Sequence, residues 1–450
     1  MNEKIQIIFG LLGGLAVFIY GMNMMSECLQ KAAGDKMKSI LALLTKNPLL
    51  GVLAGALTTA VLQSSSATTV MAIGFVSAGL MNLPQAISII FGANIGTTMT
   101  AQIIAFKISD YIYVIIFIGF LISFVTKSEK VKSIGQTIFA FGLLFLGIET
   151  MGDVMKPLAS SPVFTDLIGR VAHIPVLGVA VGTLMTLVVQ SSSATIAVLQ
   201  NFASQPGPDG VTSILGLAGA IPILLGDNIG TTITALLASI GQSKDAKRTA
   251  VAHCIFNISG CFLFIWFVKP FAVLIQSISP KGPEIEVISR QIANAHTVFN
   301  ITMTLIWVCL IKLMVKIVMT LLPDGKKGVE DPGSPIYLDE NIISQPAAAL
   351  QLVAKEIFRM SDQVRDILKK TIELVKNEEV KSIDGLKENG EQVERLGKCI
   401  TEYLAALFSS GSLTEQQAAQ TASLMCVLSD VERMGTLSVE MAECMLERSD

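Results

Sequence analysis

Gln63-Ser64-Ser65-Ser66-Ala67-Thr68 closes a long apolar stretch, and the same six residues recur as Gln190-Ser191-Ser192-Ser193-Ala194-Thr195 at the end of another. Hydroxyl and amide groups lose free energy when they are buried away from water without partners. A polar cluster at membrane depth therefore usually marks what a membrane protein handles. The repeat predicts a binding site that is built from two equivalent parts.

The composition predicts an all-α integral membrane protein with a soluble tail. Hydrophobic residues make up 51% of the 450 residues and charged residues 15%, with a mean hydropathy of +0.61. Such a chain is too apolar for an ordinary soluble protein of this size. Residues 331–450 differ from the rest, since they carry 12 Lys and Arg against 21 Asp and Glu. The lipid bilayer is therefore the expected partner of the first part, and nothing in the sequence suggests nucleic acid.

Several apolar stretches approach or exceed the about 20 residues that a membrane-spanning helix needs. They run from Ile5 to Leu29, Tyr111 to Val125, Ile134 to Gly152, Ala250 to Val268 and Ile292 to Leu313. Between them, residues 48–106 and 175–240 are apolar but interrupted by Gly, Ser, Thr, Asn and Pro. Interruptions at membrane depth are tolerated only where the backbone is buried in protein or lines a cavity.

The two interrupted regions are copies of one another. Gln63 matches Gln190 at an offset of 127 residues, and Asn94 matches Asn228 at an offset of 134. The seven extra residues fall near the turn-rich loop at residues 205–210. Each copy ends in a second shared motif, which reads GANIGTT at residues 92–98 and GDNIGTT at residues 226–232. The pattern predicts two repeats, each with a helix, a polar-ended hairpin and a broken transmembrane helix.

The loop charges predict that the two repeats are inverted, because Lys and Arg accumulate on the cytoplasmic side of a membrane. The basic clusters comprise Lys31, Lys36, Lys38 and Lys46; Lys127, Lys130 and Lys132; Lys244, Lys247 and Arg248; and Lys312, Lys316, Lys326 and Lys327. If all four lie inside, the loop at residues 153–170 lies outside, although it is equivalent to residues 31–46. Each QSSS segment then forms a re-entrant hairpin. Transporters use such inverted repeats, with the binding site at the repeat interface near the midplane.

The predicted domain boundaries follow from these patterns. A transmembrane transport domain spans residues 1–322, with repeats at about 5–126 and 134–268 and an extra helix at about 292–320. A linker at 323–340 leads to a helical domain at 341–450. Amphipathic spacing predicts three helices there, at about 345–377, 379–408 and 413–448, with Ser412 and Glu415 marking the last helix start. Its methionines, among them Met425, Met434, Met441 and Met445, are expected to fill the core.

The duplicated motifs offer hydroxyls, amides, carbonyls freed by a broken helix, and N–H groups at helix starts. Oxygen ligands suit hard cations and helix N-termini suit anions, so a site with both would bind an alkali cation together with a small oxyanion. Asn94, Thr97 and Thr98, like Asn228, Thr231 and Thr232, share one helical face. Asp227 adds a carboxylate that could bind sodium or carry a proton. Neither motif contains Arg, Lys or His, so co-bound cations would have to compensate an anion's charge.

Simpler explanations stand beside these. The glycine pairs at residues 51 and 55, 92 and 96, and 226 and 230 favour close helix packing over ligand contact. Serines in membrane helices often bond to their own backbone. The matching strings AHCIFN at 252–257 and AHTVFN at 295–300 each place His and Asn one turn apart. This spacing favours a structural role against a neighbouring helix over one near the permeation path. No nucleophile elbow surrounds the serines, so a hydrolase is not expected.

The paired QSSS motifs, the paired G-x-N-I-G-T-T motifs and the two AH-x-x-FN strings resemble the type II sodium-dependent phosphate cotransporter family over about residues 5–320. The resemblance implies sodium-driven uptake of inorganic phosphate. It places the phosphate and sodium region at Gln63, Ser64, Ser65, Ser66, Gln190, Ser191, Ser192 and Ser193. It implies cation sites at Asn94, Thr97, Asn228, Thr231 and Thr232. The tail resembles part of a PhoU domain, with a regulatory role as the implication.

The sequence thus predicts a sodium-coupled phosphate symporter that works by alternating access in the cell membrane, with a cytoplasmic tail. Thr98 and Asp227 join the predicted sodium ligands, sodium is the coupling ion, and neither enzymatic activity nor a cofactor is expected. The alternative is a membrane phosphate sensor that signals through its helical tail without net transport. The oligomeric state, including a homo-oligomer, is left open.

Overall fold

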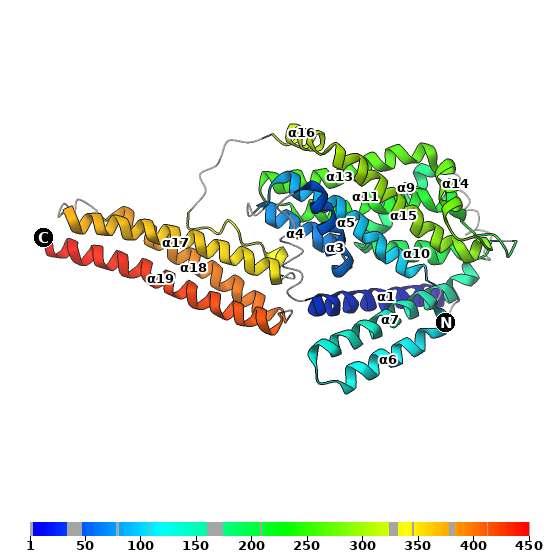
Figure 1. Cartoon of the computed structure of the whole chain (residues 1–450), viewed down its shortest axis with the longest axis horizontal. Helices are drawn as coiled ribbons and strands as arrows, with labels where there is room; N and C mark the ends of the chain where they lie inside the picture. The colour runs from blue at the N-terminus through cyan, green and yellow to red at the C-terminus, as the bar shows by residue number, and fades with distance from the viewer. Residues whose placement is uncertain are drawn as a thin grey trace. The chain divides into compact units, whose positions relative to one another are not determined.

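The computed structural model describes residues 3–33, 47–77, 81–106, 108–159, 174–207, 209–323, 332–343, 346–377, 383–411 and 413–449, which are almost entirely helical (Figure 1). The chain divides into two compact units. One comprises residues 1–73 and 81–322, and the other residues 74–80 and 323–450. Lys36, Lys38, Lys46, Lys326, Lys327 and most of the loop at 153–170 lie outside the described residues, so the loops on which the predicted orientation rests are largely not described.

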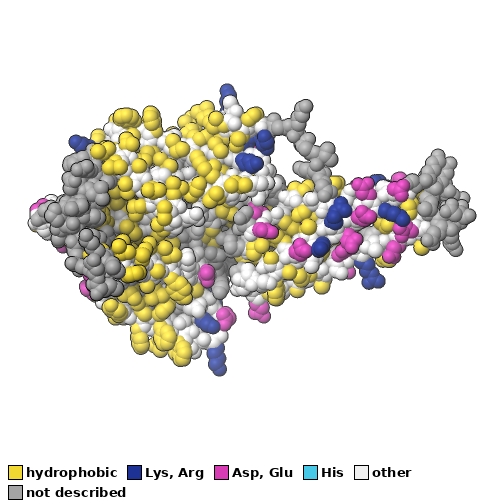
Figure 2. Space-filling view, turned by 180° about the vertical axis from the view of Figure 1, so that it is seen from behind, with side chains coloured by type: hydrophobic (Ala, Val, Ile, Leu, Met, Phe, Trp, Pro, Cys, Tyr) yellow, Lys and Arg dark blue, Asp and Glu magenta, His cyan; other side chains and the backbone are white. Residues whose placement is uncertain are grey.

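The first unit has the helices of a membrane protein. Six described stretches are long and apolar enough to cross a membrane: Gln6–Leu29, Leu83–Ile104, Glu129–Val154, Gly216–Ala238, Lys244–Ile278 and Glu284–Cys309. Figure 2 shows the broad apolar surface that these helices present, in contrast to the charged surface of the tail. An apolar surface of this extent, on helices long enough to cross a bilayer, is typical of a membrane protein. The predicted integral membrane protein is confirmed.

The repeated sequences fold into corresponding helices. In the first copy these are α1 (Glu3–Ala33), α3 (Pro48–Leu62), α4 (Ser65–Ser77), α5 (Leu83–Ile104) and α6 (Ile112–Val125). In the second they are α7 (Glu129–Ala159), α9 (Pro175–Val189), α10 (Ser192–Ala203), α11 (Gly216–Gly230) with α12 (Thr232–Ala238), and α13 (Lys244–Phe264). The 3-10 helix η3 (Ile265–Phe267), α14 (Val268–Ile278), α15 (Glu284–Cys309) and α16 (Ile311–Leu321) follow.

The predicted broken helices are largely intact. The GANIGTT motif lies inside the continuous helix α5, and in the second copy only Thr231, itself in helical conformation, separates α11 from α12. The reason is that the polar side chains donate to carbonyls of their own helix. Asn94 Nδ2 donates to Ile90 O over 2.8 Å and Thr97 Oγ1 to Ala93 O over 3.0 Å. Polar residues that bond in this way do not need to interrupt the helix.

The expected spans also need adjustment. The stretch predicted at Tyr111–Val125 forms the 14-residue helix α6 (Ile112–Val125), which is shorter than the other spans. The region predicted at Ala250–Val268 belongs to a stretch that begins at Lys244 and continues to Ile278. The two interrupted regions, in turn, contain two of the six span-length helices, Leu83–Ile104 and Gly216–Ala238. Their Gly, Asn and Thr residues lower the local hydropathy and so hid them in the sequence.

Glycines bring the helices of each repeat into backbone contact. A methyl group on Gly55 of α3 would overlap the carbonyl oxygen of Ile89 in α5, and one on Gly92 would overlap that of Val52. The same holds in the second copy for Gly182 against Ile223 O and for Gly226 against Val179 O. Small residues permit this approach between membrane helices. The interpretation of these glycines as packing residues is confirmed.

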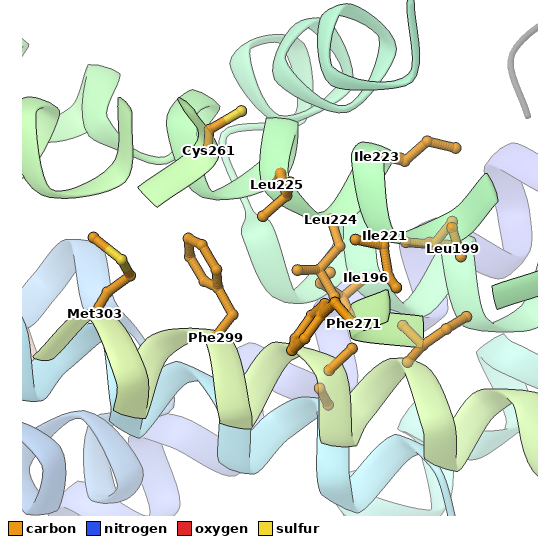
Figure 3. Packing of buried hydrophobic residues seen from close by; sticks show 14 of the residues in the cluster. Ile196, Leu199, Ile221, Ile223, Leu224, Leu225, Cys261, Phe271, Phe299 and Met303 are labelled. Atoms are coloured by element: carbon orange, nitrogen blue, oxygen red, sulfur yellow. The ribbon is translucent and has the colours of Figure 1, made fainter. Parts of the chain in front are cut away.

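The two copies share one core with the helices that follow them. Figure 3 shows side chains of α10, α11, α13, α14 and α15 converging there, with Phe271 and Phe299 at the centre. Phe256 of α13 stacks on Phe91 of α5 with ring centroids 4.9 Å apart, and so joins the second copy to the first. Phe299 of α15 contacts Phe264 of α13 edge to face at 5.1 Å. The AH-x-x-FN phenylalanines therefore help to position the polar motifs.

The tail forms the three predicted helices, α17 (Pro346–Asn377), α18 (Asp384–Ser409) and α19 (Glu415–Ser449). Ser412 lies outside the described residues, and α19 starts with a reciprocal cap instead, in which Thr414 N donates to Gln417 Oε1 and Gln417 N to Thr414 Oγ1. The buried carboxylate of Glu356 binds Arg359 over 2.6 Å and accepts the N–H groups of Ile336 and Tyr337. It thereby fastens the preceding segment to α17.

The expectation that the tail methionines fill the core is wrong for two of them. Met434 is 52% exposed and Met441 is 47% exposed, while Met425 and Met445 are half-buried. The reason is that α19 packs on its neighbours with another face, whose buried residues are Thr421, Leu428, Gly435, Ser438 and Ala442. Gly435, for instance, comes close to Val364 of α17 and Val393 of α18, where a longer side chain would not fit.

Candidate functional site

Each QSSS motif forms the turn between the two arms of a helical hairpin. Gln63 follows α3 and Gln190 follows α9, and both adopt the left-handed conformation with φ near 52° and 53°. They are the non-glycine residues with positive φ in the described part of the chain. A residue with a Cβ is strained there by about 1–3 kcal/mol, and glycine usually takes this position after a helix. A strained glutamine in both copies indicates a function for its side chain.

The first serine of each motif caps the second arm. Ser64 Oγ accepts from Ala67 N over 3.2 Å, and Ser191 Oγ accepts from Ala194 N over 3.3 Å. These two hydroxyls thus bind helix ends, as N-cap residues do. The next serines are the first residues of α4 and α10, where free backbone N–H groups favour an anion. Ser65, Ser192 and Ser193 are buried, and Ser66 is half-buried.

Threonines that sequence reasoning missed join the arms of each hairpin. Thr59 Oγ1 donates to Thr68 Oγ1 over 2.9 Å, and Thr186 Oγ1 lies 3.1 Å from Thr195 Oγ1. Thr59 and Thr186, like Thr68 and Thr195, are separated by the same 127 residues as Gln63 and Gln190. Extending the repeat comparison beyond the motifs would have found both pairs.

The copies differ beside these threonines. Asp227 is fully buried and its Oδ1 accepts from Thr186 Oγ1 over 2.7 Å. Its Oδ2 has no hydrogen-bond partner among the described residues. The equivalent of Asp227 in the first copy is Ala93. The second copy therefore has a carboxylate on α11, beside its hairpin, where α5 of the first copy has a methyl group.

The glutamines differ as well. Gln63 is buried, accepts from Thr100 Oγ1 over 2.9 Å and donates from Nε2 to Ala60 O over 2.5 Å. Gln190 is exposed. Thr234, the equivalent of Thr100, donates instead to Ser66 Oγ of the first hairpin over 3.2 Å. This bond brings the QSSS motif of one copy to the end of the GDNIGTT helix of the other.

The asparagines of the G-x-N-I-G-T-T motifs meet the AH-x-x-FN strings. His253 Nε2 lies 3.4 Å from Asn94 Oδ1, and His296 Nε2 lies 3.3 Å from Asn228 Oδ1. Because Asn Oδ1 only accepts, both imidazoles must carry their proton on Nε2 for these bonds to form. The structural role expected for the histidines agrees with these contacts, which also hold two of the predicted site residues in place.

The asparagine that ends each AH-x-x-FN string has a side-chain oxygen with no hydrogen bond to a described residue. Asn257 Nδ2 donates to His253 O, and Asn300 Nδ2 donates to His296 O and reaches Asn228 Oδ1 at 3.5 Å. The Oδ1 atoms of Asn257 and Asn300 are fully buried without a described hydrogen-bond partner. Buried polar atoms rarely stay unpaired, so each is a candidate ligand for a bound cation.

The remaining predicted ligands lie along α5, α11 and α12. Thr98 donates to Ile95 O, Thr231 to Asp227 O and Thr232 to Ile229 O, over 2.8 to 2.9 Å. A threonine that donates its proton to a carbonyl keeps lone pairs for a cation. The structure thus brings the serine and asparagine motifs of each copy together through threonines. It shows no hydrogen bond from one QSSS motif to the other within the described residues.

The duplication is matched by a family model, Na+/Pi-cotransporter, which covers residues 17–153 and again 147–279. The chain belongs to the Na+/Pi-cotransporter family. A second model, PhoU domain, covers residues 357–445. The family is one of transporters, which fits the predicted absence of enzymatic activity without testing it.

Individual relatives agree with the family. The chain is 34% identical over 263 residues to "Uncharacterized protein YqeW" of Bacillus subtilis, which covers 58% of this chain and 83% of that protein. It is 23% identical over 443 residues to "Putative inorganic phosphate export protein YjbB" of Salmonella typhimurium, over 98% of this chain and 78% of the relative. Human "Sodium-dependent phosphate transport protein 2B" is 38% identical over 142 residues, 30% of this chain and 19% of that protein. No solved structure matches the chain significantly.

Proposed function

We propose that the protein is a sodium-coupled symporter that carries inorganic phosphate into the cell. The observation that carries the proposal is Asp227, a fully buried carboxylate with one oxygen bound by Thr186 and the other unpaired. A buried ionised carboxylate costs several kcal/mol unless a positive charge lies beside it. A co-transported cation would supply that charge.

We propose that sodium rather than a proton balances this charge. The unpaired Oδ2 of Asp227 has free lone pairs, which a hard cation prefers as ligands. The hydroxyls of Thr186, Thr195 and Thr231 could supply further oxygen ligands. The unpaired oxygens of Asn257 and Asn300 support further cation sites.

Phosphate would bind at the hairpin turns. The starts of α4 and α10 offer backbone N–H groups, and Ser65, Ser192 and Ser193 offer hydroxyls. The amides of Gln63 and Gln190 add further donors. Because no basic residue belongs to either motif, phosphate affinity would depend on sodium already bound nearby. Coupling then follows from electrostatics alone.

The repeated architecture supports alternating access. We propose that the copies have inverted topology, that the hairpins enter from opposite faces, and that the PhoU domain lies in the cytoplasm. Under this arrangement the two turns approach a shared site, and motion of one copy against the other exposes it alternately. The bond between Ser66 and Thr234 is a contact between copies that such a motion would change.

Uptake of labelled phosphate into proteoliposomes tests the proposal. We expect uptake that follows an inward sodium gradient and disappears when potassium replaces sodium. Uptake that follows only a proton gradient would assign the proton to Asp227 and refute sodium coupling. Phosphate binding without net uptake would instead identify a sensor.

Phosphate export is the second candidate. The relatives that match 98% of this chain, tail included, are named putative inorganic phosphate export proteins. Vesicles loaded with labelled phosphate distinguish the directions. Protease treatment that removes exposed tails identifies which molecules have the tail outside the vesicle. If phosphate leaves the cytoplasmic side faster than it enters under matched gradients, the result would favour export.

A further inference from the structure

The outer face of α19 is apolar, although this helix is the last of a three-helix bundle. Val427, Met434, Leu437 and Met441 are each about half exposed, between 47% and 52%. The face toward α17 and α18 instead contains small residues such as Gly435 and Ala442. A soluble helix normally buries its larger apolar residues. In α19 Leu428 is buried, yet these four large apolar residues lie exposed, which indicates a surface that another molecule covers.

The exposed residues follow the spacing of a coiled coil. Positions 427, 430, 434, 437, 441 and 444 alternate in steps of three and four and read Val, Asp, Met, Leu, Met and Cys. All six are exposed. A stripe with this spacing over more than two heptads fits one straight partner helix. We call these six residues the outer seam.

We propose that the outer seam binds the outer seam of a second copy of this chain, with the two α19 helices antiparallel. In that register Met434 faces Leu437 of the other copy, Val427 faces Cys444, and Asp430 faces Met441. Arg433 and Glu440 are exposed and flank the seam on one side. In this register Arg433 of each copy lies opposite Glu440 of the other, which gives two ion pairs. The surface is complementary to itself under a two-fold axis, as closed dimers require.

The charges select this partner over others. A parallel pair would place Asp430 against Asp430 and would leave Arg433 facing Ser438, so it gains repulsion and loses both ion pairs. A lipid surface is disfavoured because residues 331–450 carry 21 acidic against 12 basic residues, and acidic domains are repelled by anionic membranes. The antiparallel pair instead keeps the two Asp430 carboxylates apart and pairs the charges of the flank.

Disulfide trapping in the full-length protein tests the register. Val427→Cys in a Cys426→Ser background should form a covalent dimer on mild oxidation through Cys444 of the other copy. Adding Cys444→Ser should abolish this dimer. A parallel pair would instead join the two engineered cysteines and keep the dimer, since positions 427 and 444 are about 25 Å apart along a helix. That result, or no covalent dimer, would overturn the proposal.

Mass measurements on the purified full-length protein in detergent test the energetics. Leu437→Lys should weaken dimerisation at least about tenfold, because it buries an unpaired charge. Ser429→Lys, on an exposed face outside the seam, is the matched control and should have little effect. Circular dichroism of each variant checks that the tail remains helical. A protein that is monomeric at micromolar concentration, or a dimer that Leu437→Lys leaves intact, contradicts the proposal.

Charge reversal provides an independent check on the flank. Arg433→Glu and Glu440→Arg should each weaken the dimer by about threefold, the typical effect of an exposed ion pair. The double variant should restore it, because the pairs reform with opposite polarity. Additive weakening in the double variant would show that the two residues do not face each other.

Discussion

The two repeats share the hydrogen bonds that form their hairpin turns, but they differ in charge. Both turn at a strained glutamine, both cap the second arm with a serine, and both join the arms through two threonines. Only the second contains Asp227, and only the first buries its glutamine against Thr100. The duplicated scaffold thus fixes where polar groups lie, while single substitutions decide which copy carries charge.

The largest effect should come from removing the charge. Asp227→Ala should lower sodium-driven phosphate uptake by about 100-fold or more, since an unbalanced buried charge of either sign is worth several kcal/mol. Ala93→Asp combined with Asp227→Ala should recover part of the loss, because Thr59 stands where Thr186 does. Uptake assays in proteoliposomes measure both. Normal uptake by Asp227→Ala would remove the carboxylate from the mechanism.

Thr186 and Thr59 occupy equivalent positions in the two repeats, so their substitutions can be compared directly. Thr186→Val removes a hydrogen bond to a carboxylate, which contributes about 1.5–3 kcal/mol, whereas Thr59→Val removes one between neutral hydroxyls worth about 1 kcal/mol. The sodium concentration for half-maximal uptake should therefore rise by about tenfold or more in the first variant and by less in the second. Equal shifts in both would mean that Asp227 does not distinguish the copies.

Substitution of the packing glycines should lower stability by similar amounts in the two repeats. Gly55→Ala and Gly182→Ala each push a methyl group into a carbonyl of the facing helix and should lower stability by about 1–3 kcal/mol. Gly13→Ala in α1 meets no atom within 4 Å and serves as the control. Thermal unfolding of the purified variants in detergent measures the difference. A marked difference between the first two variants would show that one helix pair is looser than the other.

Replacing each turn glutamine by glycine separates strain from bonding. Gln190→Gly relieves a strained conformation and should raise stability by about 1 kcal/mol. Gln63→Gly gains the same relief but loses the bond from Thr100, so its stability should change little. Melting temperatures report this difference, and phosphate uptake should fall in both variants. A stabilised Gln63→Gly protein would show that the Thr100 bond contributes nothing.

The smallest effect should come from Asp209→Ala, in the loop that lengthens the second repeat. The Thr212 hydroxyl and the N–H groups of Thr212 and Val211 lower the pKa of Asp209 from 3.8 to about 2. A lowered pKa means that the loop is stabilised above pH 4 and loses this contribution as the pH falls toward 2. Hydrogen exchange at residues 211 and 212 should therefore be faster in Asp209→Ala at pH 7, with transport unchanged. Exchange that matches the wild type would rule out this role.

Much of this arrangement could be predicted from the sequence. The repeats, the hairpins and the three tail helices follow from periodicity and from motifs that occur twice. The continuity of α5 could not, because whether Asn94 interrupts a helix depends on where its amide finds an acceptor, and Ile90 O is close enough. The exposure of Met434 was equally hidden, since amphipathic spacing does not say which of two apolar faces packs against the bundle. The threonine pairs were readable, but only once the repeat was aligned beyond its motifs.

The glycine contacts constrain how the molecule can move. The backbones of α3 and α5, and of α9 and α11, lie in direct contact at these glycines. We therefore expect sliding or twisting within either pair to cause collisions. If the proposed transport function is correct, each pair should move as a rigid unit, and the flexing of the cycle should occur elsewhere. The turns at Gln63 and Gln190 lie at the ends of these helix pairs, so a small tilt of either pair becomes a larger displacement of the serines.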